Sequence, residues 1–523
     1  MDTQQFSLSY GGDNDVGDYL YNFPADYYEL YDDQLEDENQ YYQSNVNSEM
    51  HNEPSFWSNL TFHQLCTQCV VPAVWSTGNL LGTTLILCMF FRLFIVICNK
   101  IKIVPEAVLH TVCAICGVLP LIIFHEDGDV YQLILQIVLY PMFCYIVSII
   151  CILTLKHHSS IVFSALILLT LFYRECFTND SKWQKTKSAH MLMSMKAMAI
   201  LFDIQSNKLQ TFPSVPQYIG YMMCAGTVYL GPFLTFQEYS NAFLLSVNWN
   251  KTKVCRIIWR IIISLLCFVL SICVVDWLFS QHLLVNNKSN SIINIFLTMY
   301  KQALEFRTGH YFVAYASTVF ATVCGYHSEY NSEILVTRPL VMEWPRSLLH
   351  VVVHWNAPMH YWLKKYVFEE VLKYGNKNKK QRNRFIAVGT TYLVSSLLHG
   401  LERRLSAVLL SLAAYTYVEH QIRTKLASRF PSTFSYYAKN KYPRHNSKTY
   451  LSSLNQNNWF FWFINLMFTI LNIIHLAYLG SVIDMSVDNS YNTTYQESFA
   501  PWSRVSYFSH FIMLIMFFIS ILL

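Results

Sequence analysis

Two polar side chains stand in apolar stretches of the sequence, where a polar group is costly. His399 lies fifteen residues beyond Arg384, and Asn356 lies eight residues before Lys364. At about 1.5 Å per helical residue, these separations correspond to about 22 Å and about 12 Å. In a hydrocarbon layer of about 30 Å, an ionisable residue at the greater depth is a candidate for function.

The residue types of this pair suit acyl transfer. An imidazole that stays neutral through desolvation can take a proton from a hydroxyl group, while a carboxamide can orient a carbonyl or support an oxyanion. The acid that follows His399 most closely is Glu402, at the expected turn, so the sequence does not indicate a hydrolase triad. The plainer interpretation is that each side chain only hydrogen-bonds to a neighbouring helix.

The composition indicates what kind of protein must position this pair. Of 523 residues, 53% are hydrophobic and only 13% are charged, about half the usual fraction of roughly 25% in soluble domains. Thirteen acids fall within residues 1–53, which leaves 20 acids against 37 Lys and Arg residues elsewhere. We therefore expect an all-α, polytopic, multi-pass membrane helical bundle. The composition argues against secreted enzymes, proteins that bind nucleic acid and disulfide scaffolds.

The chain divides into a tail and one membrane domain. Residues 1–60 are acidic and lack apolar periodicity, which predicts a disordered tail, whereas residues 65–523 read as a multi-pass domain. Met1 is not followed by a basic region and a short apolar core, so we expect no cleavable signal peptide. Ten to twelve membrane-embedded helices are predicted from the apolar segments 70–98, 104–124, 130–155, 160–173, 216–236, 256–279, 291–325 (split at 301–307), 385–400, 405–418, 459–482 and 505–523.

Loop charges orient the C-terminal half of the domain. Residues 364–384 carry eight bases and residues 421–448 carry seven bases without an acid, which predicts that both loops face the cytosol. The glycosylation sequon at Asn492 then lies in the lumen, and the C-terminus lies in the cytosol. The acidic tail, with a sequon at Asn59, is expected in the lumen.

Two shorter features lead to further predictions. Residues 359–374 have the pattern of an amphipathic helix at the membrane interface, with one apolar face formed by Met359, Trp362, Leu363, Tyr366, Val367, Val371 and Tyr374. Most of the fourteen cysteines, Cys273 among them, lie in apolar runs where they should act as packing residues. Cys66 and Cys69 have CxxC spacing but no second ligand pair at zinc-finger distance, so no metal site is expected.

At these residues the sequence resembles the membrane-bound O-acyltransferases, whose signature is a His in an apolar helix and an upstream Asn or His in a polar-aromatic segment. It looks like the branch that acylates Wnt proteins. The resemblance spans about residues 190–520 and rests on Met195-Lys-Ala-Met, Phe202-Asp203, Val215-Pro-Gln-Tyr-Ile-Gly-Tyr, Gly231-Pro-Phe-Leu-Thr-Phe, Glu343-Trp-Pro-Arg-Ser347, Trp355-Asn-Ala-Pro-Met, Tyr361-Trp-Leu, Leu398-His-Gly, Val408-Leu-Leu-Ser-Leu, Tyr417-Val-Glu-His420 and His475-Leu-Ala-Tyr-Leu-Gly480.

The resemblance implies an activity and a compartment. His399 and Asn356 would occupy the two active-site positions of the family, with His399 as general base. The reaction would transfer a palmitoleoyl group from palmitoleoyl-CoA to a serine of a Wnt protein in the endoplasmic reticulum membrane, supporting Wnt secretion and signalling. Fatty acyl-CoA, Wnt proteins and membrane lipids would be the partners, with no permanently bound cofactor and no nucleic acid. We also expect five residues to contribute to substrate binding: Trp355, Ser395, Ser396, Gly400 and Tyr366.

The acyl chain is expected in an apolar tunnel between segments 385–400 and 405–418. Small residues leave room there, namely Ser395, Ser396, Ala407, Ser411, Ala413 and Ala414. An equally good interpretation is that they only allow close helix packing.

Two alternative functions stay open. An enzyme of the same fold that acts on a lipid or on a different secreted peptide would share His399 and Asn356. A transporter would be favoured by two-fold repetition of broken helices or by several intramembrane acids, and the sequence shows neither.

Overall fold

The described part of the chain is built from helices. The computed structural model describes residues 60–101, 104–123, 130–177, 181–228, 230–244, 249–283, 292–327, 333–375, 380–429, 459–483 and 498–523. Within these ranges the regular elements are α-, 3-10 and π-helices, and no strand occurs. This confirms the all-α fold class. The acidic tail, most of the basic loop 421–448 and the Asn492 sequon lie outside the described residues.

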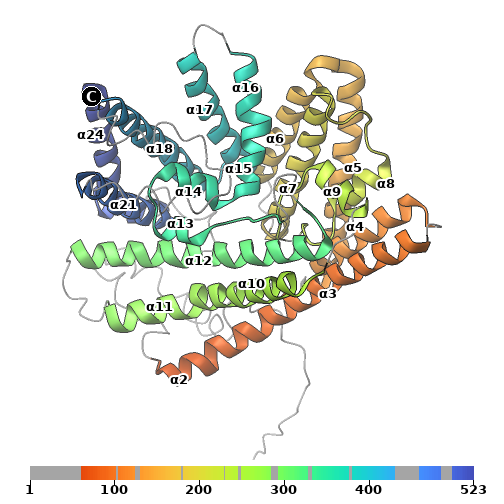
Figure 1. Ribbon diagram of the computed structural model, residues 1–523, viewed down its shortest axis with the longest axis horizontal. Coiled ribbons are helices and arrows are strands. Elements are labelled where there is room, and N and C mark those ends of the chain that lie inside the picture. Colours follow the sequence, from red (N-terminus) through yellow and green to blue (C-terminus); the bar gives the residue numbers. More distant parts are fainter. Residues whose placement is uncertain are drawn as a thin grey trace, which may run out of the picture.

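The N-terminal half begins with one continuous helical run that is followed by antiparallel helices (Figure 1). Its elements are α2 (Phe62–Leu65), η3 (Cys66–Val70), α3 (Val71–Ile101), α4 (Glu106–Ile123), α5 (Val130–Leu155), η4 (Lys156–His158), α6 (Ser159–Phe177), α7 (Ser181–Gln205), α8 (Val215–Met222) and α9 (Phe236–Leu244).

The C-terminal half contains a long helix, a hairpin and a group of terminal helices. Its elements are α10 (Lys251–Val269), η5 (Leu270–Val274), α11 (Val275–Leu278), η6 (Phe279–Leu283), α12 (Ile292–Cys324), α13 (Pro339–Glu343), α14 (Leu348–Trp355), α15 (Ala357–Leu363), η7 (Lys364–Phe368), α16 (Glu369–Lys373), α17 (Lys380–Leu398), α18 (Arg403–Arg429), α21 (Trp459–Gly480), α23 (Ala500–Arg504) and α24 (Phe508–Leu522).

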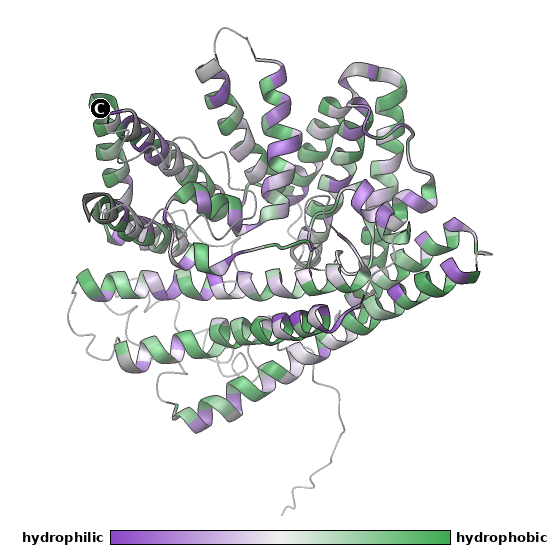
Figure 2. Ribbon diagram, in the orientation of Figure 1, coloured by the Kyte–Doolittle hydropathy of each residue, from purple (hydrophilic) through white to green (hydrophobic). Residues whose placement is uncertain are grey.

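Six of the described helices are long and apolar enough to cross a membrane. They are Phe62–Ile101, Glu106–Ile123, Ile134–Leu155, Ser159–Phe177, Lys251–Gln281 and Phe463–Gly480. Large apolar side chains lie exposed on them, for example Trp75 and Leu153 at 69% and 72%, which is expected of surfaces that face lipid. Figure 2 shows that hydrophilic residues interrupt α12 and α18. The membrane character is confirmed, and the count of ten to twelve embedded helices stays a prediction.

The segment 216–236 is not the single apolar helix that the sequence predicted. Helix α8 ends at Met222, and the described residues from there to Thr235 contain no helix. Gly226 and Gly231 have φ values of +72° and +82°, which end helical structure, and Pro232 lacks a backbone N–H. The split expected in 291–325 is also wrong, because α12 runs unbroken from Ile292 to Cys324.

Helix α7 was missed because it carries charged residues that the fold buries. Lys196 is fully buried, and its ammonium donates hydrogen bonds to the Tyr221 carbonyl at 2.9 Å and the Thr227 hydroxyl at 3.0 Å. These partners lie on a chain segment far from α7 in the sequence. A window of hydropathy therefore cannot show that this lysine belongs to the core.

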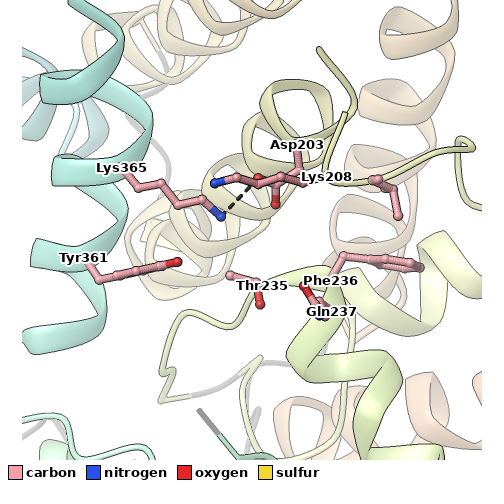
Figure 3. Close-up of a pocket in the computed structure, with 8 residues that line it drawn as sticks. Asp203, Lys208, Thr235, Phe236, Gln237, Tyr361 and Lys365 are labelled. Atoms are coloured by element: carbon pink, nitrogen blue, oxygen red, sulfur yellow. Dashed lines mark ion pairs between the residues drawn. The ribbon is translucent and has the colours of Figure 1, made fainter. Parts of the chain in front are cut away.

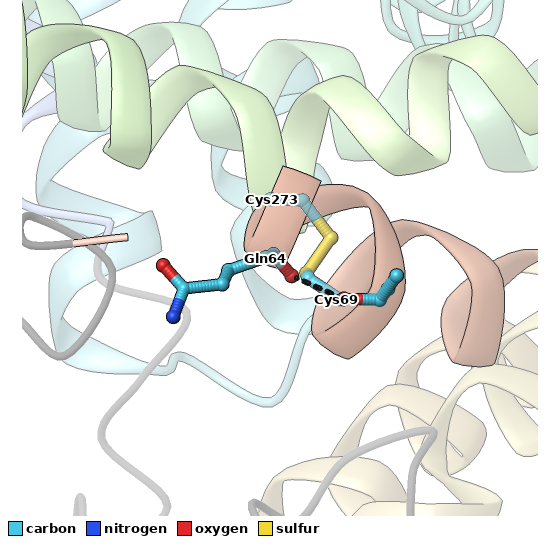
Figure 4. The surroundings of a disulfide bond; sticks show 4 residues. Gln64, Cys69 and Cys273 are labelled. Atoms are coloured by element: carbon cyan, nitrogen blue, oxygen red, sulfur yellow. Dashed lines mark hydrogen bonds between the residues drawn. A yellow bond between two sulfur atoms is a disulfide. The ribbon is translucent and has the colours of Figure 1, made fainter. Parts of the chain in front are cut away.

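A disulfide joins the first helical run to the η5 segment (Figure 4). Cys69 pairs with Cys273 across 204 residues of sequence. The expectation that Cys273 is a free packing residue is therefore wrong, since the spacing of cysteines cannot reveal a partner on a distant helix. Most other cysteines of the apolar runs are free and buried, as expected of small apolar residues.

A helical hairpin rises from a layer of long helices. α3, α10 and α12 lie side by side, and the run α15–η7–α16 stands above them and pairs with α17 (Figure 1). The middle of the apolar face of that run is buried in the protein, with Trp362 and Tyr366 only 1% and 3% exposed, whereas Tyr374 at its end is 63% exposed. The Trp362 indole donates a hydrogen bond to the Met195 carbonyl of α7 at 2.9 Å. Most of the face that was predicted to lie at the membrane interface therefore contacts protein.

Candidate active site

His399 lies at the C-terminal end of α17, where the helix is closed by a Schellman motif. The amide of Gly400 donates to the Leu397 carbonyl and the amide of Leu401 donates to the Ser396 carbonyl, both at 2.9 Å. Gly400 has a φ of +74°, in the left-handed region that favours glycine. The imidazole of His399 is therefore carried by the last residue before the chain reverses, and this residue is partly exposed.

Gly400 is required by a close contact as well as by its backbone conformation. A Cβ atom built on Gly400 would lie 2.8 Å from both the Cβ and the Cγ of Glu175 on α6. The end of α17 therefore rests directly against the last turn of α6. The structure shows a packing role for Gly400, and its predicted role in substrate binding stays a prediction.

Glu175 is the acceptor of a buried cluster beside His399. Its carboxylate accepts a hydrogen bond from the Lys187 ammonium at 2.7 Å and another from the Trp183 indole at 2.7 Å. The side chains of Lys187 and Glu175 are 19% and 12% exposed. Because Glu175 also touches Gly400, this ion pair lies beside the turn that carries His399. Sequence reasoning missed this ion pair because its two residues lie on α6 and α7, far from His399 in the sequence.

Asn356 lies at the break between α14 and α15. Its φ and ψ of −141° and 88° are not helical, and Pro358 occupies the first turn of α15. The Asn356 side-chain oxygen accepts a hydrogen bond from the Met359 amide at 3.1 Å, so the residue is the N-cap of α15. Because the oxygen is used by the cap, the amide hydrogens are the groups that can serve a ligand.

Trp355 is fixed by helix α12. Its ring stacks on His310 at a centroid distance of 4.0 Å and an interplanar angle of 6°. The Nε2 of His310 donates a hydrogen bond to the Trp355 carbonyl at 2.7 Å, and Phe306 stacks on Trp355 at 5.7 Å. The predicted binding residue Trp355 thus holds the helix break at which Asn356 lies.

The hairpin brings Asn356 and His399 to the same end. The run α15–η7–α16 has 17 residues and α17 has 19, joined by a short link, so both residues lie roughly 25–28 Å from that link along the helices. The two runs are antiparallel, and α17 packs against η7 and α16. Ser395 and Ser396 lie one turn before His399 and are buried at 6% and 1% exposure.

Tyr366 contacts two residues, Asp203 and Lys365, that line a cavity of about 260 Å³ at the middle of the hairpin. The Tyr366 hydroxyl donates to Asp203 at 2.9 Å and accepts from Lys365 at 2.7 Å, and Lys365 pairs with Asp203 at 3.0 Å. Figure 3 shows Lys365 and Tyr361 on one side of this cavity and Thr235, Phe236 and Gln237 on another. The cavity is lined by Asp203, Lys208, Leu209, Thr235, Phe236, Gln237, Tyr361 and Lys365. Tyr366 therefore supports the lining without belonging to it.

A π-helical turn, η7, contains Lys365 of the cavity lining. It inserts a wider turn at Lys364–Phe368 within the α15–α16 run, and such turns recur at functional sites. Within the described residues, no three His, Cys, Asp or Glu side chains gather in a way that would hold a metal ion.

The chain is similar to known acyltransferases over most of its length. A model of the membrane-bound O-acyltransferase family matches residues 139–476. The chain is 32% identical over 479 residues to the protein-serine O-palmitoleoyltransferase porcupine of Homo sapiens, covering 86% of this chain and 95% of the human protein. The protein of the same name from Mus musculus is 33% identical over 483 residues with the same coverage. That of Drosophila melanogaster is 31% identical over 349 residues, or 64% of this chain and 63% of the fly protein.

Proposed function

Because this chain belongs to the membrane-bound O-acyltransferase family, it is an acyltransferase, and we propose that it transfers a palmitoleoyl group from palmitoleoyl-CoA to a serine of Wnt proteins. The proposal is carried by the similarity to proteins named protein-serine O-palmitoleoyltransferase, which covers 95% of the human protein at 32% identity. The placement of His399 and Asn356 at one end of the hairpin supports it.

In this proposal His399 is the general base. Its neutral imidazole accepts the proton of the acceptor serine while the serine oxygen attacks the thioester carbonyl. The carbon–sulfur bond then breaks, and the imidazolium returns the proton to the departing CoA thiolate. The products are a serine ester and free CoA, so the imidazole is neutral again after each turnover.

Asn356 supports the negative charge that develops on the thioester oxygen. Its carboxamide oxygen is occupied by the N-cap of α15, which leaves the NH₂ group to donate to an oxyanion. The N-cap also fixes the orientation of the carboxamide before the substrate arrives. Such preorganisation is what makes an oxyanion donor effective.

The cavity at the middle of the hairpin suits the anionic part of CoA. Its lining includes the cations Lys208 and Lys365, and the lining residue Tyr361 lies five residues beyond Asn356 in the same helical run. Lys365, nine residues beyond Asn356, is about 13 Å along the helix from it. The pantetheine arm could cover such a distance and bring the thioester to His399. Tyr366 would act here by holding Lys365 in place.

The acyl chain would extend from His399 between α17 and α18. The small residues Ser395 and Ser396 are buried on α17, one turn before His399. The tunnel rests on the sequence pattern and on the need to bury a chain that gains about 0.8 kcal/mol for each CH₂ removed from water.

We place the protein in the endoplasmic reticulum membrane with its N-terminal tail in the lumen and its C-terminus in the cytosol. The basic residues 364–384 support a cytosolic position for the link of the hairpin. The disulfide of Cys69, which lies close after the tail, supports an oxidising lumen on that side.

An in vitro transfer assay tests the proposal. Purified protein in lipid nanodiscs is mixed with acyl-CoAs of several chain lengths and with a Wnt-derived serine peptide, the same peptide with Ser→Ala, an unrelated secreted serine peptide or a lipid alcohol. We expect acylation of the Wnt serine peptide alone, best with palmitoleoyl-CoA. Transfer to a lipid alcohol or to the unrelated peptide with no transfer to the Wnt peptide would refute the proposed acceptor.

A further inference from the structure

We propose that Glu175 and Lys187 are positioning residues of the acyl-transfer site, whose ion pair holds the end of α17 and balances the charge that His399 carries after it takes the serine proton. This inference rests on the proposed function. It concerns two residues on α6 and α7 that are neither in the motif around His399 nor among the expected binding residues.

The first support is a direct fit between Glu175 and the turn that carries His399. The Gly400 backbone approaches so closely that a Cβ atom there would meet the Cβ and Cγ of Glu175 at 2.8 Å and its Cδ at 2.9 Å. No side chain separates the carboxylate stem from the residue that follows the base. A movement of Glu175 would therefore move the turn and the imidazole with it.

The second support is the way in which Glu175 is held. Trp183 is 1% exposed, and its indole N–H donates to one carboxylate oxygen at 2.7 Å, while Lys187 donates to the other at 2.7 Å. Both oxygens are therefore engaged, and the carboxylate has one orientation. A part-buried ion pair with this geometry costs desolvation, which is repaid only when both partners stay in place.

The third support is the charge balance around the base. The Lys187 ammonium is bound to Glu175, whose side chain touches Gly400 next to His399, and a positive charge so placed disfavours an imidazolium. Acyl transfer requires His399 to become positively charged for part of each turnover. Glu175 compensates Lys187, so that the imidazolium forms beside a pair without net charge. Removing one member of the pair should therefore have the opposite effect to removing the other.

Several other titratable or charged groups near the end of α17 have partners of their own. On α6, Arg174 lies over the Trp183 ring at 4.6 Å and donates to Gln136. On α7, His190 contacts the Thr186 carbonyl through Nδ1 at 2.9 Å. At the start of α18, the Glu402 carboxylate accepts from the amides of Arg404 and Leu405. The charged residues of η7 and α16, such as Lys364 and Glu369, lie towards the link of the hairpin.

The test is the pH dependence of acyl transfer in Glu175→Gln, Lys187→Met and the double variant Glu175→Gln/Lys187→Met. The matched control is Glu333→Gln, because Glu333 is also 12% exposed and paired with Arg256 and Arg260 at 2.6 Å, outside the site. Full-length proteins are purified in nanodiscs, and kcat/KM for the serine peptide is measured across pH, since its acidic limb reports the base in the free enzyme.

We expect the acidic limb to move to lower pH in Glu175→Gln, where Lys187 is uncompensated, and to higher pH in Lys187→Met, where Glu175 is uncompensated. A shift of one pH unit corresponds to about a tenfold change in the fraction of protonated base at a fixed pH. The double variant should return the limb towards its wild-type position. Glu333→Gln should leave it unchanged.

A purely structural pair would give a different result. Both single variants would then lower expression, or lower the rate equally at all pH values, without moving the acidic limb of kcat/KM. That outcome refutes the inference. Unchanged pH profiles in both single variants also refute it. If Glu175→Gln does not fold, Lys187→Met alone tests the inference: a shift of its acidic limb to higher pH supports the inference, and no shift or a shift to lower pH refutes it. If the wild-type protein acylates the serine peptide and the acidic limb does not move in the variants, only this inference is refuted. Wild-type protein that acylates no serine peptide refutes the proposed function.

Discussion

Gly400→Ala tests whether the end of α17 is as tightly determined as the structure shows. The substitution places a Cβ where φ is +74° and where Glu175 atoms lie at 2.8 Å. The left-handed conformation costs roughly 1–2 kcal/mol for a residue with a side chain, and overpacking costs roughly 1–3 kcal/mol. The turn must therefore absorb about 2–5 kcal/mol, by strain or by moving His399 away from α6.

A matched control lies on the same helix. Gly389 has an ordinary φ, and a Cβ built on it meets no atom within 4 Å. Gly389→Ala should therefore be neutral or stabilise α17 by roughly 0.5–1 kcal/mol, because alanine favours the helix. The comparison separates the effect of an added methyl group from the effect of its position.

Two measurements check this prediction. Thermal unfolding of detergent-solubilised protein, followed by size-exclusion profiles, should show a lower midpoint for Gly400→Ala and an equal or higher one for Gly389→Ala. Transfer of an alkyne palmitoleoyl group to the Wnt serine peptide should fall by about 30-fold or more in Gly400→Ala, since 1.4 kcal/mol corresponds to a factor of ten. If Gly400→Ala matches Gly389→Ala in both measurements, the Gly400–Glu175 contact does not determine the site.

Substitutions of His399, Asn356, Ala413 and Cys69 test the remaining parts of the site and fold. His399→Ala, expressed at wild-type level in membranes, should lower alkyne labelling of Wnt by roughly 10²–10⁴-fold, and near-normal labelling would disprove its role as base. Asn356→Ala should lose up to about 3 kcal/mol of transition-state stabilisation. Asn356→Asp keeps the N-cap acceptor but lacks the NH₂ group, so it should lose as much turnover if the NH₂ group supports the oxyanion. Normal turnover in Asn356→Asp would show that Asn356 acts only as the N-cap of α15. Ala413→Phe should shift preference towards shorter acyl-CoAs if it lines the tunnel, whereas unchanged preference with lower expression indicates packing. Cys69→Ser should remove a disulfide worth about 2–4 kcal/mol, seen by thiol alkylation without reductant and a lower unfolding midpoint, while Cys66→Ser, a free cysteine three residues away, should not.

The helices that the sequence predicted well are those whose apolar character is local. Segments 104–124, 130–155 and 459–482 agree with α4, α5 and α21 within a few residues, because a lipid-facing helix needs an apolar residue at nearly every position. The end of α17 agrees with the predicted segment 385–400 and follows from Gly400 in the same local way. The break at Asn356 was not predicted, although Pro358 is a local signal for it.

The predictions that failed depend on partners far away in the sequence. Helix α7 was not among the predicted helices, and its buried Lys196 is satisfied by the carbonyls of Tyr221 and Met222. The apolar face of 359–374 was predicted to lie at the membrane interface, whereas Trp362 and Tyr366 on that face donate hydrogen bonds to Met195 and Asp203 of α7. Glu175 and Lys187 could not be related to His399 from spacing, since they reach it only through the packing of α6 and α7 on α17.

The Cys69–Cys273 bond also bears on biosynthesis. Its two sulfur atoms are separated by 204 residues, so the bond cannot close until the ribosome has passed residue 273. By then the four apolar helices up to Phe177 have already been synthesised, and α10 must reach the first helix before the thiols meet. Until that moment Cys69 is a free thiol. Closure of the bond thus marks nascent chains whose first and second halves have docked correctly.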